Sequence, residues 1–458
     1  MAAATRARTA GSGSGRRRSG ESRSRTPSGS PPAPAPASAG PPAAGGAAGS
    51  VTPRPASRSG SFGPVRLQQF VLIEVAAAIV LVAWIVDELL LVPAAAVGLV
   101  LVLLAVVRRR QQPISEWLST AASLRRRKRL AAKPLDAGTD PGFAIAVECE
   151  PALRTLTFID RDRRAVGMVG DGTFLTAVLQ VEAVDAPLRP QRAQQPLPLA
   201  LLRDAMEVDG ILLESVQVVQ HTLPAPAHHL PAQSLALRNY APLQAQTGAP
   251  AVRMTWVALK FDPELCPEAV AARGGGLGGA QRCLLRTADQ LASRLQGAGF
   301  GVTVLTEESL TAAIATAASA NQRATAQAGR RDTLNRRTLE SARAWRCDDR
   351  WHTAYWIGRW PQMDPASAPL PQLAALLTSL PALSTTLSLT LHRGGKLGGR
   401  HAPTISGHVR ITGRSADELV NIRKELERTA RGVRIGLVRL DREQVPGVLA
   451  TLPLGGTR

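Results

Sequence analysis

Two long apolar runs between residues 70 and 107 dominate the pattern of hydrophobic and polar positions. They read FVLIEVAAAIVLVAWIV and LLLVPAAAVGLVLVLLAVV, and only Asp87 and Glu88 separate them. The second run has no charge, and as a helix it would be roughly 28 Å long, close to the hydrocarbon thickness of a bilayer. The first run contains Glu74 near its start, and neither run has the polar stripe of a soluble core helix. A two-helix transmembrane hairpin is therefore predicted over residues 65–110.

Basic residues flank both ends of this hairpin. Ten precede Leu67, and nine lie in residues 108–133. Because Lys and Arg concentrate in cytoplasmic loops, both flanks and both chain termini are predicted to be cytoplasmic, in a multi-pass membrane protein. The residues expected to anchor and orient the hairpin are Glu74, Trp84, Asp87, Glu88, Arg108, Arg109 and Arg110.

The segments on either side of the hairpin have distinct compositions. Residues 1–64 are mostly Gly, Ser, Pro, Ala and Arg, cannot bury enough apolar surface to fold, and are predicted to be disordered. Residues 111–140 form a basic juxtamembrane helix and connector, which could lie on the membrane, bind a partner or extend the second span into solvent. Its candidate contacts for lipid or a partner are Trp117, Arg125, Arg126, Arg127, Lys128 and Arg129.

From residue 141 onward the pattern changes to short alternating strands, typical of an antiparallel sheet. Strands are predicted at residues 144–149, 154–159, 165–169, 173–183 and 211–221, with a short helix at 199–206.

Two later stretches share one pattern of strand, helix and strand. They occupy residues 252–305 and 404–440, and each follows a partner strand, at 212–220 or 384–392. The predicted fold class is therefore α/β (α+β), with two β–β–α–β-like units forming a cytosolic domain after the hairpin and the disordered tail. Residues 141–318 would form its first part, 319–344 an exposed Arg-rich linker, and 345–458 its second part.

The formal net charge of +20 is unevenly distributed along the chain, so it does not by itself indicate a nucleic-acid-binding protein. Residues 1–133 hold 19 Lys and Arg against 5 Asp and Glu, and residues 134–458 hold 36 against 30. The excess belongs to the tail and the hairpin flanks, where it favours contact with anionic lipid headgroups rather than with nucleic acid. The four cysteines lie far apart, without the spacing of a zinc site or a disulfide framework, and are interpreted as reduced.

Several short motifs resemble fragments of known sites. Asp160 and Asp162 form a DxD pair that could hold a metal ion in a membrane-anchored transferase, although Asp in a turn between strands is the simpler interpretation. The glycine-rich stretches GMVGDG and HRGGKLGGRH lack the helix or hydroxyl residue of a phosphate site, although the second could contact an anion. The stretch RGGGLGG opens a predicted helix and could bind an anion there, although a flexible helix entry is the simpler interpretation. His228 and His229 have no partner ligands nearby in sequence. Four tryptophans between residues 345 and 360 are expected in a core, or on a partner-facing patch. No catalytic residue, cofactor or metal site is predicted.

Longer strings carry a family resemblance. They are DRDRRAVGMVGDGTFLTAVLQVEA, SVQVVQHTLPAPAHHLPAQSLA, NYAPLQAQTGAPAVRMTWVALKFDPELCPEAVAARGGGLGGAQRCLLRTADQLASRL and VLTEESLTAAIA. These resemble the EccE component of actinobacterial type VII (ESX) secretion systems, most strongly over residues 160–318.

The resemblance implies a structural subunit of an inner-membrane secretion complex, without an established catalytic site. It would assemble with EccB-, EccC- and EccD-type subunits, among which the EccC-type ATPase supplies the energy. The alternative from another class is the metal-dependent transferase built on Asp160 and Asp162.

Overall fold

The computed structural model describes most of the chain after residue 64. The described residues are 54–55, 61–62, 65–86, 91–106, 108–109, 112–131, 139–183, 196–223, 235, 238–239, 242, 252–330, 335–361, 369–394, 396–397, 400–401 and 403–457. Most of the tail predicted to be disordered lies outside them.

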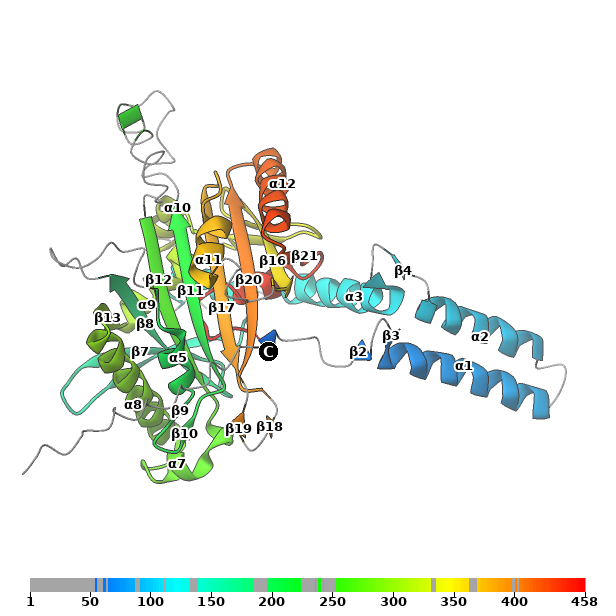
Figure 1. Ribbon diagram of the computed structural model, residues 1–458, viewed down its shortest axis with the longest axis horizontal. Helices are drawn as coiled ribbons and strands as arrows, with labels where there is room; N and C mark the ends of the chain where they lie inside the picture. Colours follow the sequence, from blue (N-terminus) through cyan, green and yellow to red (C-terminus); the bar gives the residue numbers. More distant parts are fainter. Residues whose placement is uncertain are drawn as a thin grey trace, which may run out of the picture. The chain divides into compact units, whose positions relative to one another are not determined.

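Two apolar helices form where the hairpin was predicted, but the prediction that they cross a membrane was wrong. Helices α1 (Leu67–Val86) and α2 (Leu91–Val106) lie side by side (Figure 1). Among the described residues, no helix combines the length and the apolar character that a bilayer crossing requires. Helix α2 has only 16 residues, a rise of about 24 Å against roughly 30 Å of hydrocarbon, and α1 includes Gln68, Gln69 and Glu74.

The remainder is organised by a 13-stranded sheet in the order β14-β15-β16-β20-β17-β11-β12-β8-β7-β6, with β13 on β8, β21 on β16 and β1 on β20. All the pairings are antiparallel except that of β1 with β20. The strands are β1 (Arg54–Pro55), β6 (Arg154–Ile159), β7 (Ala165–Gly170), β8 (Leu175–Ala183), β11 (Ser215–Leu223), β12 (Val252–Phe261), β13 (Phe300–Val304), β14 (Thr338–Glu340), β15 (Trp345–Cys347), β16 (Arg350–Arg359), β17 (Ser384–His392), β20 (Thr404–Gly413) and β21 (Gly436–Arg439).

Two similar halves meet at the centre of this sheet, where β11 pairs with β17 and Val218 lies opposite Leu389 (Figure 1). In the first half β8 pairs with both β12 and β13, and in the second half β16 pairs with both β20 and β21. The chain order β11-β12-α8-β13 recurs as β17-β20-α12-β21. The last strand of each predicted unit therefore pairs with an earlier strand, and the two halves share one continuous sheet.

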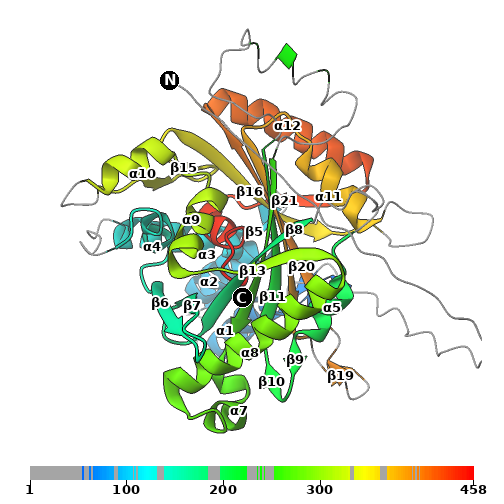
Figure 2. The same cartoon turned by 90° about the vertical axis from the view of Figure 1, so that its left-hand side faces the viewer.

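Helices cover both faces of the sheet, as the nearly edge-on view of Figure 2 shows. One face packs against α5 (Leu199–Asp204), α7 (Pro267–Ala271), α8 (Gly276–Gly297), α11 (Leu370–Thr378) and α12 (Ala416–Gly432). The other packs against α4 (Ala144–Cys149), α9 (Glu307–Ala317) and α13 (Gln444–Leu449). Residues 144–149 were predicted as a strand but form the helix α4. All six residues are buried, and periodicity alone does not distinguish a short, fully buried helix from a strand.

The smaller elements complete the description. They are β2 (Ser61–Phe62), β3 (Val65–Arg66), β4 (Arg108–Arg109), β5 (Gln112–Pro113), α3 (Ile114–Leu130), β9 (Glu207–Val208), β10 (Ile211–Leu212), η3 (Pro263–Leu265), α10 (Gln322–Ala328), β18 (Lys396–Leu397) and β19 (Arg400–His401). Helix α10 and strand β14 lie within residues 319–344, the segment predicted to be an exposed linker.

The face under α4, α9 and α13 is buried and carries many polar residues beside the apolar side chains of Val178, Val219, Trp256 and Ala258. Its polar residues, called the polar face below, alternate with apolar ones along five central strands and β8, and none is more than 6% exposed. They are Thr176, Gln217, His221, Lys260, His352, Thr386, Ser388, Thr390, Arg410 and Thr412. Because buried polar groups require hydrogen-bond partners, whatever covers this face must supply them.

Residues 450–456, called the C-terminal strap below, supply many of these partners. The Gln217 amide donates to the Ala450 carbonyl and accepts from the Gly455 amide, at 2.9 and 2.8 Å. The Ser215 hydroxyl donates to the Gly455 carbonyl at 2.6 Å, and Thr176 donates to that of Leu454 at 3.0 Å. The strap thus ties the end of the second half to strands of the first.

Only glycine fits at position 455 of the strap. Its φ is +89°, and a Cβ there would lie 2.5 Å from Cβ of Lys260. Replacing Gly455 with Ala should lower the free energy of unfolding by at least about 2 kcal/mol, measured by urea denaturation. Gly432→Ala is the control, because Gly432 is exposed and a Cβ there meets nothing within 4 Å. Equal stability of the two variants would show that the strap does not hold the sheet.

Candidate functional site

The residues predicted to anchor a membrane hairpin are only partly described. Glu74 and Trp84 lie on α1 with exposed side chains, and Trp84 is 68% exposed. Arg108 and Arg109 form β4. Asp87, Glu88 and Arg110 lie outside the described residues. Large apolar side chains are nevertheless exposed on both α1 and α2, with Ile85 at 73% and Val92 at 77%. Such exposed apolar surface marks an interaction site in a folded protein.

Helix α3 carries the predicted basic cluster, and the structure divides that cluster in two. Arg125, Arg126, Lys128 and Arg129 are exposed, whereas Arg127 points into the sheet domain. Its Nε and Nη2 donate to the two carboxylate oxygens of Glu340 at 2.9 and 3.0 Å, and Nη2 also donates to the Arg442 carbonyl. The Glu340 carboxylate also accepts the Val445 amide of α13 at 3.0 Å. Trp117 also lies on α3.

Such a bidentate pair is directional, and with Glu340 only 6% exposed it is shielded from water. A second hydrogen bond lies nearby, in which Arg336 donates to the Ala131 carbonyl just beyond α3. The two contacts fix the end of α3 against β14 and α13. Four cations therefore remain available to a lipid or a partner, while the fifth holds the helix in place.

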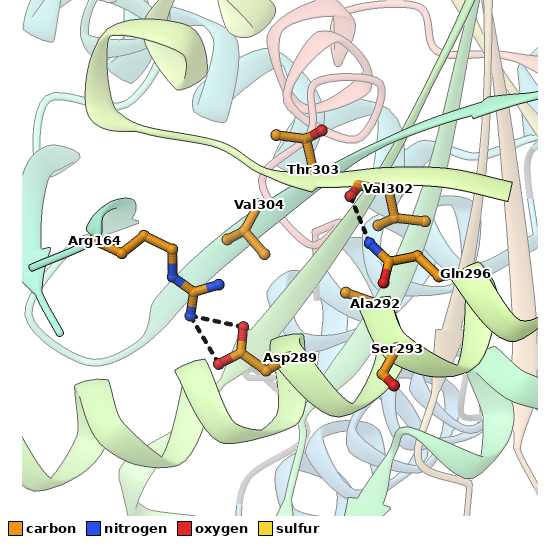
Figure 3. A pocket seen from close by; sticks show the side chains of 8 residues that line it. All are labelled: Arg164, Asp289, Ala292, Ser293, Gln296, Val302, Thr303 and Val304. Carbon is orange, nitrogen blue, oxygen red and sulfur yellow. Dashed lines mark hydrogen bonds and ion pairs between the residues drawn. The ribbon is translucent and has the colours of Figure 1, made fainter. Parts of the chain in front are cut away.

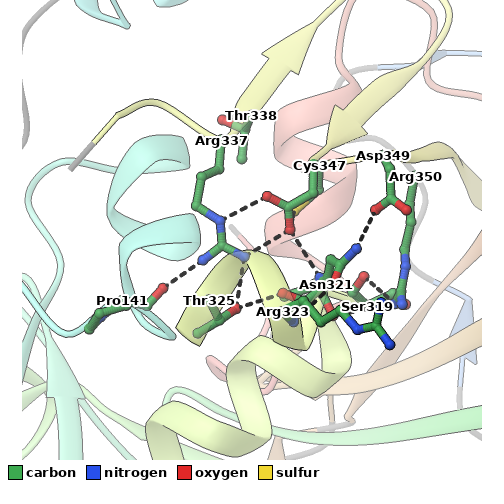
Figure 4. Close-up of polar contacts among 12 residues, drawn as sticks. Pro141, Ser319, Asn321, Arg323, Thr325, Arg337, Thr338, Cys347, Asp349 and Arg350 are labelled. Carbon is green, nitrogen blue, oxygen red and sulfur yellow. Dashed lines mark hydrogen bonds and ion pairs between the residues drawn. The ribbon is translucent and has the colours of Figure 1, made fainter. Parts of the chain in front are cut away.

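A second network, shown in Figure 4, organises the segment predicted to be a linker. Arg337 forms a bidentate pair with Asp348 at 2.9 and 2.8 Å, and both side chains are 7% exposed. The same guanidinium donates to the Pro141 carbonyl and to the Thr325 hydroxyl. Its backbone amide donates to the buried Glu148 carboxylate at 2.9 Å. The network joins segments far apart in sequence, which only tertiary packing could reveal.

Arg410 lies at the centre of the polar face and is fully buried. Its Nε donates to the Thr451 hydroxyl at 2.8 Å, and Nη2 donates to the Ala317 carbonyl and to Thr386. Its Nη1 lies 3.4 Å from Nδ1 of His352. All of these partners are neutral, so Arg410 has hydrogen bonds but no counter-charge among the described residues.

Burial controls the titration of the groups around Arg410. It lowers the pKa of His221 to about 3, helped by the positive charges of Arg410 and Arg350, and it lowers that of His352 well below its ordinary value. Burial also raises the pKa of the Cys149 and Cys347 thiols above their ordinary value. The histidines are therefore neutral and the thiols protonated at pH 7. All four cysteines are free and buried.

The Asp160 and Asp162 pair is arranged as a turn. The Asp160 carboxylate accepts the Arg161 amide at 2.7 Å and lies 3.7 Å from Arg164, while Asp162 is exposed. In the described part of the chain, no group of three or more His, Cys, Asp or Glu side chains could hold a metal ion. The metal-dependent transferase gains no support from this geometry.

A shallow pocket of about 350 Å³ lies between α8 and β13 (Figure 3). At one end Arg164 donates to both oxygens of Asp289 at 2.8 Å, and Gln296 donates to the Val302 carbonyl. These polar groups already satisfy one another, so the pocket presents little free chemistry. It is lined by Arg164, Asp289, Ala292, Ser293, Gln296, Val302, Thr303 and Val304.

The four tryptophans are distributed between core and periphery. Trp345 is fully buried against His352, whereas Trp351, Trp356 and Trp360 are half-buried. The sequence did not single out Glu340, Arg337 or Arg410, and it grouped Arg127 with the cations predicted to contact lipid or a partner. The alternation of polar and apolar residues in β11 and β17 was the available signal, but it is equally typical of a face open to water.

Comparison with known proteins gave a match to a protein family. Residues 249–357 match a protein-family model described as "Putative type VII ESX secretion system translocon, EccE". They run from just before β12 into β16 and include Arg337, Asp348 and Thr325 of the network described above. No curated protein matches the chain. The family match confirms the resemblance found in the longer strings of the sequence.

Because the histidines inside the sheet domain have lowered pKa values, we expect the protein to lose stability in mild acid. The folded-state pKa is about 3 for the buried His221 and about 4 for the half-buried His408, whereas the ordinary value is 6.5. Between the folded-state value and 6.5, only the unfolded chain binds these protons. Stability should be constant above pH 6.5 and fall as the pH decreases toward 4. At pH 5 each such histidine should cost about 2 kcal/mol.

Urea denaturation at pH 7.5, 6 and 5 measures this loss. His221→Gln should remove part of the pH dependence, because glutamine cannot bind the proton. An unfolding free energy that stays constant from pH 7.5 to 5 would contradict the assignment of neutral, buried histidines.

Proposed function

We propose, from the premise that this chain is an EccE protein of a type VII secretion translocon, that it is a non-catalytic structural subunit with a docking module at the periphery of the complex. The family match over residues 249–357 is the observation that carries this proposal. The matched segment runs from the central strand β12 to β14 and β15 at one edge of the sheet, and it includes the Arg337–Asp348 pair. Its expected partners are EccB-, EccC- and EccD-type subunits and inner-membrane lipid.

Exposed apolar surface on α1 and α2 supports a place at the membrane-associated complex. Trp84, Ile85 and Val92 are each more than two-thirds exposed, and leaving such side chains in water is unfavourable. Contact with other subunits or with lipid would cover them. The proposed docking surface consists of these residues, Glu74 and the four exposed cations of α3.

The Arg127–Glu340 pair gives this surface a fixed connection to the sheet domain. Without this pair, the hydrogen bond from Arg336 to the Ala131 carbonyl would be the main described polar contact that holds the end of α3 beside β14 and α13. We therefore assign Arg127 a positioning role and the exposed Arg125, Arg126, Lys128 and Arg129 a role in binding anionic groups.

Affinity purification of the full chain from membranes tests the proposal. EccB-, EccC- and EccD-type proteins should co-elute with the wild-type chain. Arg127→Met should reduce their recovery several-fold, whereas Arg129→Met, which removes an exposed cation of the same helix, should reduce it less. A folded chain that brings down none of the three subunits would overturn the proposed function, and equal recovery from the two variants would overturn only the role of Arg127.

Substitution of both Asp160 and Asp162 by Ala separates the structural role from the transferase. The structural proposal expects assembly and substrate export to remain unchanged, because both residues lie in a turn. Loss of export from a variant that still folds and assembles would favour the metal-dependent enzyme instead.

A further inference from the structure

We infer that strand β13 is a docking edge, at which an extended and uncharged peptide segment of a partner protein adds to the sheet. The segment would lie along the pocket between β13 and α8 (Figure 3). This inference goes beyond the proposed function, which assigns docking to α1, α2 and α3. It rests on the unpaired edge of β13, on the chemistry of the pocket and on a comparison with the equivalent strand of the second half.

The outer edge of β13 has no partner strand among the described residues. β13 pairs with β8 alone, in a continuous antiparallel register. Just beyond the strand, the Leu305 amide donates to the Val178 carbonyl at 2.9 Å. Because hydrogen-bonded positions alternate in an antiparallel pair, the backbone groups of Thr303 face β8 and those of Val302 face outward. The outward groups are the ones that a further strand would bind.

A side chain of α8 already makes one contact of the kind that a further strand would make. Nε2 of Gln296 donates to the outward carbonyl of Val302 at 3.2 Å (Figure 3). Gln296 is exposed and this distance is at the long end of the hydrogen-bond range, so a backbone amide of a peptide can replace the Gln296 amide at small cost. In the described part of the chain, the Val302 amide itself has no hydrogen-bond acceptor.

The pocket beside this edge indicates what kind of segment would bind. Ala292, Val302 and Val304 contribute apolar surface to its volume of about 350 Å³. At one end the Arg164 guanidinium donates to both carboxylate oxygens of Asp289 at 2.8 Å, so their charges cancel. An extended segment with an uncharged, apolar side chain over Ala292 matches this surface, and its backbone would pair with β13.

A single strand fits this edge better than a second copy of the chain. A second copy that paired through its own β13 would bring its own α8 alongside. The ion pair of Arg164 with Asp289 crosses the pocket at this edge and restricts the space for such a layer. We therefore assign the edge to a peptide segment.

The equivalent strand β21 in the second half has features that discourage a further strand. Its register with β16 shifts between Ile357 and Arg359, which leaves Gly358 as a bulge. It ends in Arg439, which pairs with Asp441 at 2.7 Å. Bulges and charged residues are common protections of a sheet edge. β13 reads FGVTV, with no charge, proline or register shift, so it lacks these protections.

Selection from a phage-displayed library of random linear heptapeptides, with the full chain as bait, tests the inference. Bound peptides should alternate apolar and polar residues and carry few charges. Val302→Pro removes the outward amide without removing a hydrogen bond to β8, and should weaken the binding of a selected peptide at least tenfold in fluorescence polarisation. Val302→Thr keeps the amide and the branched side chain, and should bind within about twofold of the wild type.

A second pair of variants decides the question if Val302→Pro does not fold. Ser293 is exposed and lines the pocket, so Ser293→Tyr should block the pocket and weaken peptide binding at least tenfold. Arg294→Tyr changes the exposed neighbour, which does not line the pocket, and should leave binding unchanged. A library that yields no binding peptide, or peptides that Ser293→Tyr does not affect, would overturn the inference.

Backbone methylation of a selected peptide separates strand addition from binding by side chains alone. Methyl groups on every second amide in one register should abolish binding, because they remove the hydrogen bonds to β13, whereas methylation in the other register should be tolerated. Equal effects of the two registers would contradict strand addition. Sedimentation of the free chain checks the alternative occupant: a dimer that Val302→Pro converts to a monomer would assign this edge to a second copy and overturn the choice of a peptide.

Discussion

The hydrogen-bond demand of the buried polar face is the constraint on which the rest of the structure depends. A sheet with one apolar and one polar face would normally leave the polar face in water. Here both faces are covered, so Gln217, Arg410 and their neighbours must find partners inside the protein. The end of α9 and the C-terminal strap provide them, through the Ala317 carbonyl, the Thr451 hydroxyl and the backbone of Gly455. The chain terminus is therefore an integral part of the core.

This constraint connects the duplicated architecture to the proposed role. The two halves join through β11 and β17, and the strap crosses from the second half to strands of the first. Arg127 and Glu340 then attach α3 to the same body beside α13, the helix that leads into the strap. Within the described residues, a few directional contacts link α3, and with it the proposed docking surface, to the sheet. Such an arrangement suits a structural subunit of a translocon.

The sequence allowed individual helices and strands to be predicted more reliably than the pairing and packing between them. Alternation located β6, β7, β8 and β17, and the repeated strand-helix-strand pattern placed α8 and α12. It could not show that β13 pairs with β8, or that residues 144–149 form a buried helix, because pairing and burial depend on distant segments. Hydropathy likewise identified α1 and α2, but among the described residues neither helix meets the requirement for crossing a bilayer. The Arg337–Asp348 and Arg127–Glu340 pairs join residues whose types alone suggested a solvated linker and a uniform basic helix.

The central claim is that the two halves and the strap form one cooperative unit around the polar face. Native-state hydrogen exchange of the full chain, measured by mass spectrometry in increasing urea, tests it most directly. Amides of β11, β12, β17 and β20 should exchange with one common opening free energy and one common urea dependence, equal to those of global unfolding. Exchange of β17 and β20 through a separate, smaller opening that leaves β11 and β12 protected would contradict the account.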